Sequence, residues 1–289
     1  MHQGHDSEFG GDPTTPRVPK VGIIGVGTIA EALTNGLCAF GDRRVEILLS
    51  PRNDANSSRL AHRYPNVKIA ANNQAVVDGS EIVLLAVRPQ VIEEVLRPLH
   101  FRPDQHILSL VATFSVKQLS SLVAPAKDIS RAVPLPPVAE RRGPLTLYTQ
   151  SAEVARLLHG LGSLIRVDDE AHLDLISAAT SLMGTYFGMT GAVDGWLVER
   201  GFKTEASRAF VTELFFSLAL AAKQRPEESF SKLSADYSTG GGLNEQAWRE
   251  LRAAGWSDQI QAALDLILDR IQGRATLDTQ LPRNREPHR

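Results

Sequence analysis

The chain has 289 residues, of which 43% are hydrophobic and 22% are charged, and its formal net charge is −2. This balance is ordinary for a globular protein and provides no global field that would attract nucleic acid or an anionic membrane surface. The length predicts two domains, and the single cysteine, Cys38, excludes an internal disulfide framework.

Residues 1–19 are polar and are expected to form a disordered tail, in which His2 and His5 lack the third ligand that a metal site needs. Residues 20–167 then alternate short apolar runs with helical patterns, which predicts a Rossmann-type, doubly wound α/β domain. The strands are expected at 21–24, 45–49, 67–70, 82–87, 107–111 and 129–133, and the helices at 29–40, 55–63, 72–77 and 89–96.

From 168 to 273 apolar residues recur at helical spacing, which predicts an all-α domain followed by a polar tail over 274–289. We expect one long or two joined helices over 168–199 and further helices over 204–223, 226–233, 243–254 and 257–271, with Gly273 ending the last. Several of these helices are apolar around most of their circumference, as buried helices are. So short a domain cannot cover them alone, so we predict a homodimer built through this half.

The segment Gly25-Val26-Gly27-Thr28-Ile29-Ala30 follows the first predicted strand and opens the first helix. In such a segment Gly25 permits a tight turn, Gly27 lets the backbone approach a pyrophosphate, and Ala30 permits close packing of helix and strand. Amides at the helix start bind the phosphates. The alternative is a tight turn without a ligand, but the strand–turn–helix context favours a dinucleotide site made by Gly25, Gly27, Thr28, Ile29 and Ala30.

The second predicted strand ends at Leu49-Ser50-Pro51-Arg52-Asn53, without the Asp or Glu that usually holds the ribose of NAD. Ser50 and Asn53 can donate hydrogen bonds, and the guanidinium of Arg52 can pair with a 2′-phosphate. This pattern predicts NADP (NADPH) as the cofactor. The alternative is that Arg52 is a solvated turn residue.

The fourth strand is followed by Ala86-Val87-Arg88-Pro89, where an open α/β sheet gathers its ligands. We therefore add Ala86, Val87, Arg88 and Pro89 to the predicted cofactor contacts, although Arg88 can equally be a surface charge.

With these motifs, the chain resembles the pyrroline-5-carboxylate reductase family from about Lys20 to Ile271. Its opening strand, glycine loop and helix are similar to those of the family. Ala86-Val87-Arg88-Pro89-Gln90 is similar to Ala-Val-Lys-Pro-Gln, Arg131-Ala132-Val133-Pro134 to Arg-x-Met-Pro, and Ser238-Thr239-Gly240-Gly241-Gly242 to Ser-Pro-Gly-Gly-Thr-Thr. The resemblance implies a cytoplasmic enzyme of proline biosynthesis that reduces a cyclic imine with NADPH, and an interlocked helical dimer.

The departures from the family pattern lie on the substrate side. Leu135-Pro136-Pro137 stands where the family has Asn-Thr-Pro, and Gly242-Leu243 where it has two threonines. We predict a divergent member that acts on pyrroline-5-carboxylate or a related imine. The substrate contacts that the resemblance implies are Ser238, Thr239, Gly240, Gly241, Gly242 and Asn244.

The catalytic residue stays open, with Tyr186, Thr180 and Ser181 as candidates. Two other functions remain open for the chain. One is an NADP-dependent oxidoreductase for a small carbonyl or hydroxy acid, and the other is an NADP-binding protein without activity. No membrane or nucleic-acid partner and no metal are expected.

Overall fold

The computed structural model describes residues 18–39, 45–52 and 54–280. It divides into two compact units, the first ending at Leu173 and the second beginning at Asp174. The boundary predicted from the sequence, between 167 and 168, lies slightly earlier. Each unit is described by itself.

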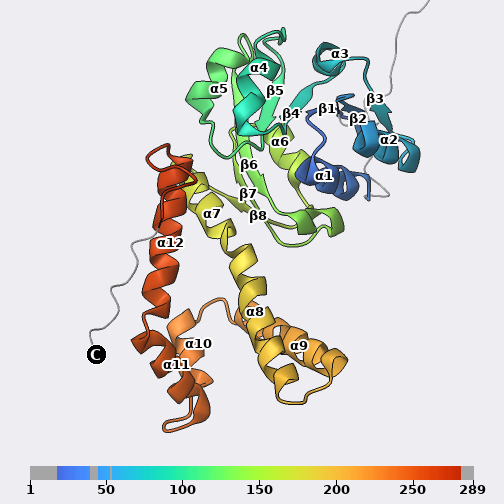
Figure 1. Cartoon of the computed structure of the whole chain (residues 1–289). Coiled ribbons are helices and arrows are strands. Elements are labelled where there is room, and N and C mark those ends of the chain that lie inside the picture. The colour runs from blue at the N-terminus through green and yellow to red at the C-terminus, as the bar shows by residue number, and fades with distance from the viewer. Residues whose placement is uncertain (1–17, 40–44, 53, 281–289) are drawn as a thin grey trace, which may run out of the picture. The chain divides into compact units, whose positions relative to one another are not determined.

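In the described residues of the first unit, eight strands form one sheet in the order β3-β2-β1-β4-β5-β6-β7-β8 (Figure 1). Neighbouring strands are parallel except β6 and β7, which are antiparallel. The first six strands follow the order of a Rossmann sheet, so the predicted fold class is confirmed. The strands are β1 (Lys20–Ile24), β2 (Glu46–Leu49), β3 (Val67–Ile69), β4 (Ile82–Leu85), β5 (His106–Ser109), β6 (Asp128–Pro134), β7 (Pro144–Tyr148) and β8 (Ser163–Arg166).

Two apolar clusters cover the two faces of this sheet, because successive strand residues point to opposite sides. Ile23 belongs to one cluster and Ile24 to the other. Helices α1, α2 and α6 contribute to the first cluster, and α3, α4 and α5 to the second. The helical segments are α1 (Thr28–Cys38), α2 (Asp54–Arg63), α3 (Asn73–Asp78), η1 (Pro89–Val91), α4 (Ile92–Leu96), α5 (Val116–Leu122), η2 (Pro136–Glu140) and α6 (Ala152–Leu158). A strand covered on both faces is continuously apolar, which is why β4 was recognisable in the sequence.

β7, β8, α5 and α6 are not among the elements predicted from the sequence. β7 is paired on both sides but has Thr146 between its two leucines, and β8 is the largely exposed edge strand, so neither has the continuous apolar run of β4. The start of α5 could have been predicted from the sequence, since Ser115 and Gln118 form a capping box there. The capping serine of α6, Ser151, accepts from the amide of Val154 in the same way.

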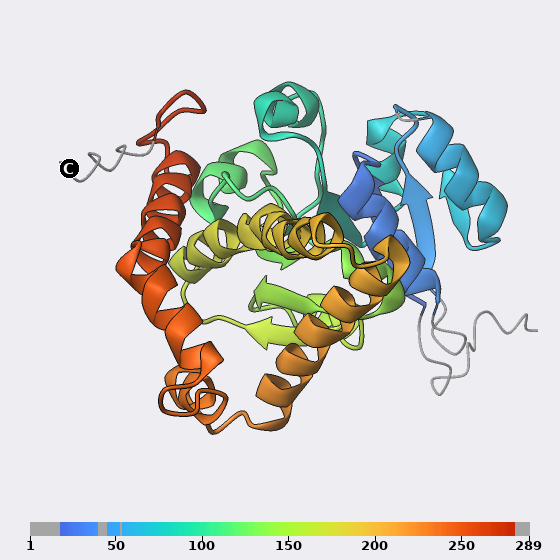
Figure 2. The same cartoon turned by 60° about the horizontal axis from the view of Figure 1, so that its bottom comes forward.

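The second unit is helical in the part of the chain that the structure describes (Figure 2). The segment predicted over 168–199 is two helices, joined at Ser181. α8 and α9 pack together, and the buried hydroxyl of Ser207 donates to the carboxylate of Asp194 over 2.6 Å. The helices are α7 (Ala171–Thr180), which crosses the unit boundary, α8 (Leu182–Glu199), α9 (Thr204–Gln224), α10 (Phe230–Asp236), α11 (Leu243–Ala253) and α12 (Trp256–Ile271).

The helix predicted over 226–233 is misplaced. Ser229 accepts a hydrogen bond from the amide of Lys232, and this cap starts α10 at Phe230. Gly273 follows α12 with a φ of 75°, the left-handed conformation that ends many helices.

Both predicted tails extend beyond the described residues. Residues 1–17 and 281–289 lie outside them, and 274–280 contain no helix or strand. Within 18–39, 45–52 and 54–280, none of the helices has the length and hydropathy needed to cross a membrane.

Candidate functional site

The carboxyl edge of the sheet has its topological switch point between β1 and β4. The chain leaves β1 for α1 on one face and leaves β4 for α4 on the other. Open α/β sheets bind ligands in the crevice at this point. Gly25 lies here with a φ of 92°, and a Cβ added to it would come within 2.8 Å of the carbonyl oxygen of Ala86. The structure thus brings together Gly25 and Ala86, two residues predicted from separate motifs.

The start of α1 is sterically open. Gly27 caps the helix, and a Cβ added to it would meet nothing within 4 Å. Thr28 is exposed and Ile29 half-buried, whereas Ala30 is only 1% exposed and packs in the core. The backbone at Gly27 therefore has room beside it for a ligand. A phosphate group fits here because the amides of this first turn and the helix dipole both favour an anion.

Ser50 connects this loop to the end of β2. Its side chain is 1% exposed, and its hydroxyl accepts a hydrogen bond from the amide of Gly25 over 3.0 Å. The amide of Ser50 donates to the carbonyl of Ile23, and its own carbonyl accepts from the hydroxyl of Ser57. Ser50 is thus held from three sides and in turn holds the glycine loop. Its predicted hydrogen bond to the cofactor remains a prediction.

Helix α2 holds the same loop through a residue that the sequence analysis did not select. The side-chain amide of Asn56 donates to the carbonyl of Val26 over 3.0 Å. Arg59 donates to the side-chain oxygen of Asn56 and to the carboxylate of Glu31 on α1, at 2.9 and 2.6 Å. In the sequence, Asn56 is marked only by its place in the first turn of α2, directly after the loop that follows β2. Its partner is far away along the chain, so spacing alone does not identify it.

Two arginines are exposed at the carboxyl edge. Arg52 lies in the turn after β2, and Arg88 lies after β4, directly before η1. Val87 and Pro89 beside Arg88 are half-buried. Asn53, the remaining predicted contact on the β2 side, lies outside the described residues.

The three catalytic candidates lie on α7 and α8. The hydroxyl of Thr180 donates to the carbonyl of Ser177, and that of Ser181 to the carbonyl of Ala178, both over 2.7 Å. Both protons are thus engaged by the helix backbone. Tyr186 is 44% exposed, and its ring meets Phe215 edge to face. Part of the Tyr186 side chain thus lies at the surface of the described chain.

The loop between α10 and α11 contains the predicted substrate contacts. Asn244 donates its side-chain amide to the carbonyl of Tyr237 over 2.7 Å, and Ser238 donates to the carbonyl of Ser234. Gly241 has a φ of 72°, and its amide donates to the carboxylate of Glu245 over 2.5 Å. A side-chain carboxylate therefore already occupies one amide of the loop that was predicted to bind a substrate carboxylate.

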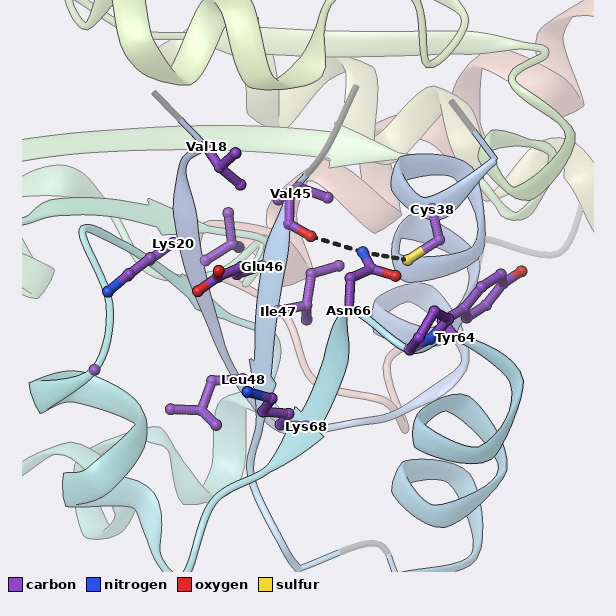
Figure 3. A pocket seen from close by; sticks show the side chains of 13 residues that line it. Val18, Lys20, Cys38, Val45, Glu46, Ile47, Leu48, Tyr64, Asn66 and Lys68 are labelled. Atoms are coloured by element: carbon purple, nitrogen blue, oxygen red, sulfur yellow. Dashed lines mark hydrogen bonds between the residues drawn. The ribbon is translucent and has the colours of Figure 1, made fainter. Parts of the chain in front are cut away.

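A separate hollow of about 690 Å³ lies at the opposite, amino end of the strands (Figure 3). Its lining includes Lys20, Glu46, Tyr64 and Cys38, and it does not include the glycine loop. Burial raises the pKa of the Cys38 thiol, while a hydrogen bond from Asn66 opposes that rise. The hollow lies at the end of the strands opposite the switch point, and Cys38 is a partly buried packing residue.

The amino-acid sequence is similar to those of known reductases. Residues 20–113 match the family model described as NADP oxidoreductase coenzyme F420-dependent. The chain is 28% identical to the pyrroline-5-carboxylate reductase of Haemophilus influenzae, over 89% of this chain and 98% of that protein. It is 26% identical to the enzyme of that name from Pseudomonas aeruginosa, over 87% and 95%.

Solved structures agree with this resemblance. The 1-pyrroline-5-carboxylate reductase of Streptococcus pyogenes is similar with a TM-score of 0.79 and 25% identity, over 89% of this chain and 99% of that one. The pyrroline carboxylate reductase of Plasmodium falciparum, solved with NADP bound, shares the fold with a TM-score of 0.77 at 15% identity, over 89% and 98%. The resemblance to pyrroline-5-carboxylate reductases that the motifs indicated is confirmed over most of the chain.

Proposed function

We propose that the protein is an NADPH-dependent reductase that converts the C=N bond of a small cyclic imino acid, pyrroline-5-carboxylate or a related imine, to the amine. The observation that carries the proposal is the glycine loop at the switch point, with Gly25 against Ala86 and open space beside Gly27. The similarity to pyrroline-5-carboxylate reductases along nearly the whole chain supports the choice of substrate class.

The cofactor is held in two places on the first unit. The amides from Gly27 to Ala30 take the diphosphate, because the backbone at Gly27 has room beside it and these amides lie at the positive end of α1. Arg52 takes the 2′-phosphate, because its exposed guanidinium lies at the carboxyl end of β2, the adenosine side of the switch point. With Arg52 there, NADPH is favoured over NADH. Arg88 and the residues beside it border the cofactor after β4.

Bound NADPH supplies a hydride to the imine carbon, the π electrons of the C=N bond move to nitrogen, and nitrogen keeps or takes up one proton. The protein's task is to align the reacting atoms and exclude water. Among the three candidates on α7 and α8, we assign to Tyr186 the role of holding a proton near the substrate. The hydroxyls of Thr180 and Ser181 are committed to backbone carbonyls.

The substrate carboxylate binds at the loop of Ser238, Thr239, Gly240, Gly241, Gly242 and Asn244, which precedes the N-terminus of α11. The Glu245 carboxylate competes for the amide of Gly241, so it must turn away before a substrate carboxylate can use that amide. This competition gives the chain a weaker carboxylate site than a loop with two threonines.

A second copy of the chain covers the apolar helices of the second unit. No residue of α8 is buried within the described single chain, and Phe187 is 68% exposed. A Cβ added to any of four glycines spaced along one face of α8 meets nothing within 4 Å, and these are Gly184, Gly188, Gly191 and Gly195. Small residues on one face let a partner helix approach closely. These features support a homodimer built through residues 168–273, and we place it in the cytoplasm.

A substrate panel tests the proposal. Purified protein is mixed with NADPH and with pyrroline-5-carboxylate, a six-membered cyclic imino acid, or an acyclic keto acid, and oxidation is followed at the nicotinamide absorbance. Turnover with an imine supports the proposal. Turnover with the keto acid alone favours a carbonyl reductase, and binding of NADPH without turnover of any compound favours a protein that has lost its activity.

A further inference from the structure

Arg131 is a buried cation in the middle of the sheet. It belongs to β6, where it pairs in register with Ser109 of β5, and its side chain is only 4% exposed. Arginine is rarely buried unless its charge and its hydrogen-bond donors are satisfied. The groups that Arg131 contacts therefore indicate which segment of the structure it holds in place.

Two partners of Arg131 come from other segments of the first unit. One guanidinium nitrogen donates to the Glu170 carboxylate over 2.6 Å, and the other donates to the carbonyl of Ala112 over 2.5 Å. The same Glu170 oxygen accepts from the amide of Val116, the first residue of α5, over 2.7 Å. Arg131 and Glu170 thus bind both ends of the loop Ala112–Ser115, all within the first unit.

The loop Ala112–Ser115 follows β5 at the carboxyl edge of the sheet. A Rossmann sheet binds its two nucleotides on two halves, the first made by β1 to β3 and the second by β4 to β6. With Arg52 after β2 reading the adenosine phosphate, the nicotinamide falls on the half that contains this loop. Thr113 in the loop is exposed, so the loop presents a surface to that half.

We propose that Arg131 and Glu170 are positioning residues for hydride transfer, acting by fixing the loop Ala112–Ser115 beside the nicotinamide. The proposal rests on the proposed function. Neither residue touches the reacting atoms. Arg131 holds the start of the loop directly, at the Ala112 carbonyl, and holds its far end through Glu170, which accepts from the Val116 amide. Contacts at both ends set the loop position more tightly than a single bond, and reaction geometry is sensitive to shifts of about 1 Å.

Two variants test the proposal in the full-length protein. Arg131→Lys keeps the charge but cannot reach Ala112 and Glu170 together, and Glu170→Gln keeps the shape but loses the charge. The matched control is Arg97→Lys, which alters the exposed Arg97–Glu93 pair on α4. We expect kcat with pyrroline-5-carboxylate to fall about 10- to 100-fold in both variants, with the NADPH Kd changed less than about twofold. The control should match the wild type.

Hydrogen–deuterium exchange supplies a readout that does not depend on activity. In the wild type, NADPH should slow exchange in the peptide that contains Ala112–Val116, and both variants should lose that protection. An unchanged kcat overturns the proposal. So does a parallel loss of kcat, NADPH affinity and Tm, which would mean a purely structural role.

If the wild type reduces no imine, the proposed function is wrong. Hydrogen–deuterium exchange then still tests whether Arg131 positions the loop Ala112–Ser115. Protection of the loop by NADPH that depends on Arg131 then supports positioning, and absence of such protection overturns it.

Discussion

The amide of Gly25 donates a hydrogen bond to the hydroxyl of Ser50 over 3.0 Å, so the loop that follows β1 is tied to the residue that follows β2. Asn56 adds a second tie, from α2 to the carbonyl of Val26. The segment proposed to bind the diphosphate and the segment proposed to read the 2′-phosphate are therefore mechanically connected. Substitutions in the two segments should nevertheless have separable effects on cofactor binding.

Ser50→Ala should weaken the binding of NADPH and NADH by the same factor. The change leaves the Gly25 amide without its acceptor in a partly buried position, and such a loss costs up to about 1–3 kcal/mol. We expect the Kd of both cofactors, measured by calorimetry, to rise about tenfold, since part of that cost appears as lost stability. Thr34→Ala is the control, because Thr34 is also buried but its hydroxyl donates to Ala30 of its own helix. A loss confined to NADPH would mean that Ser50 reads the 2′-phosphate itself.

Arg52→Gln should affect NADPH alone. Hydrogen bonds to a charged group contribute about 1.5–3 kcal/mol, so the Kd of NADPH should rise about 10- to 100-fold while that of NADH stays constant. Arg63→Gln is the matched control, because Arg63 is exposed on α2 but is directed to Asn35 and the Tyr64 ring. An unchanged Kd for NADPH would make Arg52 a solvated turn residue.

The two loop glycines should respond differently to alanine. At Gly25 the positive φ and the 2.8 Å approach to Ala86 make any side chain strained, so Gly25→Ala should lower the Tm. At Gly27 the added methyl meets only open space, so Gly27→Ala should keep the Tm and lose cofactor affinity. Differential scanning fluorimetry with and without NADPH measures both. Full NADPH stabilisation of Gly27→Ala would place the diphosphate elsewhere.

The second unit should associate with another copy. Sedimentation of the 31.5 kDa chain should give the mass of a dimer at micromolar concentration. Phe216→Asp on α9, where the phenyl ring is 59% exposed, should shift the protein towards monomer, whereas Lys223→Glu on the same helix should not. A wild type that sediments as a monomer at all concentrations would contradict a dimer built through these helices.

The thiol of Cys38 should react slowly. Burial raises its pKa, and only the thiolate is alkylated, so at pH 7.5 a smaller thiolate fraction is present than in an ordinary cysteine. The rate with iodoacetamide should keep rising with pH beyond the usual cysteine midpoint. Protein unfolded in guanidinium is the control, and equal rates in the folded and unfolded states would exclude the effect of burial. Cys38→Ala should leave NADPH binding unchanged.

Local features of the first unit were predictable from the sequence, and non-local ones were not. The β1–loop–α1 segment can be predicted from the sequence because its buried strand, its turn and its helix are adjacent in the chain. The ties from Ser50 and Asn56 to the same loop depend on residues that meet only after the sheet has formed. β8 was missed for a related reason, since it is placed by pairing with β7 and not by a run of apolar residues.

Thr180, Ser181 and Asn244 are predicted to lie at the substrate site, and their hydrogen-bond partners could not be predicted from the sequence. A hydroxyl on a helix can turn to its own backbone, as those of Thr180 and Ser181 do. Glu245 lies in the first turn of α11, and its carboxylate accepts a hydrogen bond from the Gly241 amide. This contact bears on carboxylate binding, a consequence that charge patterning alone does not reveal.

The most direct test of imine reduction is isotopic. The protein is incubated with pyrroline-5-carboxylate and with NADPH deuterated at C4 of the nicotinamide, on either face in separate reactions, and the amine is analysed by mass spectrometry. We predict that one face delivers a single deuterium to the former imine carbon of proline. Saturable binding of NADPH without deuterium in proline, or in the product of any related cyclic imine, would contradict the proposed reaction.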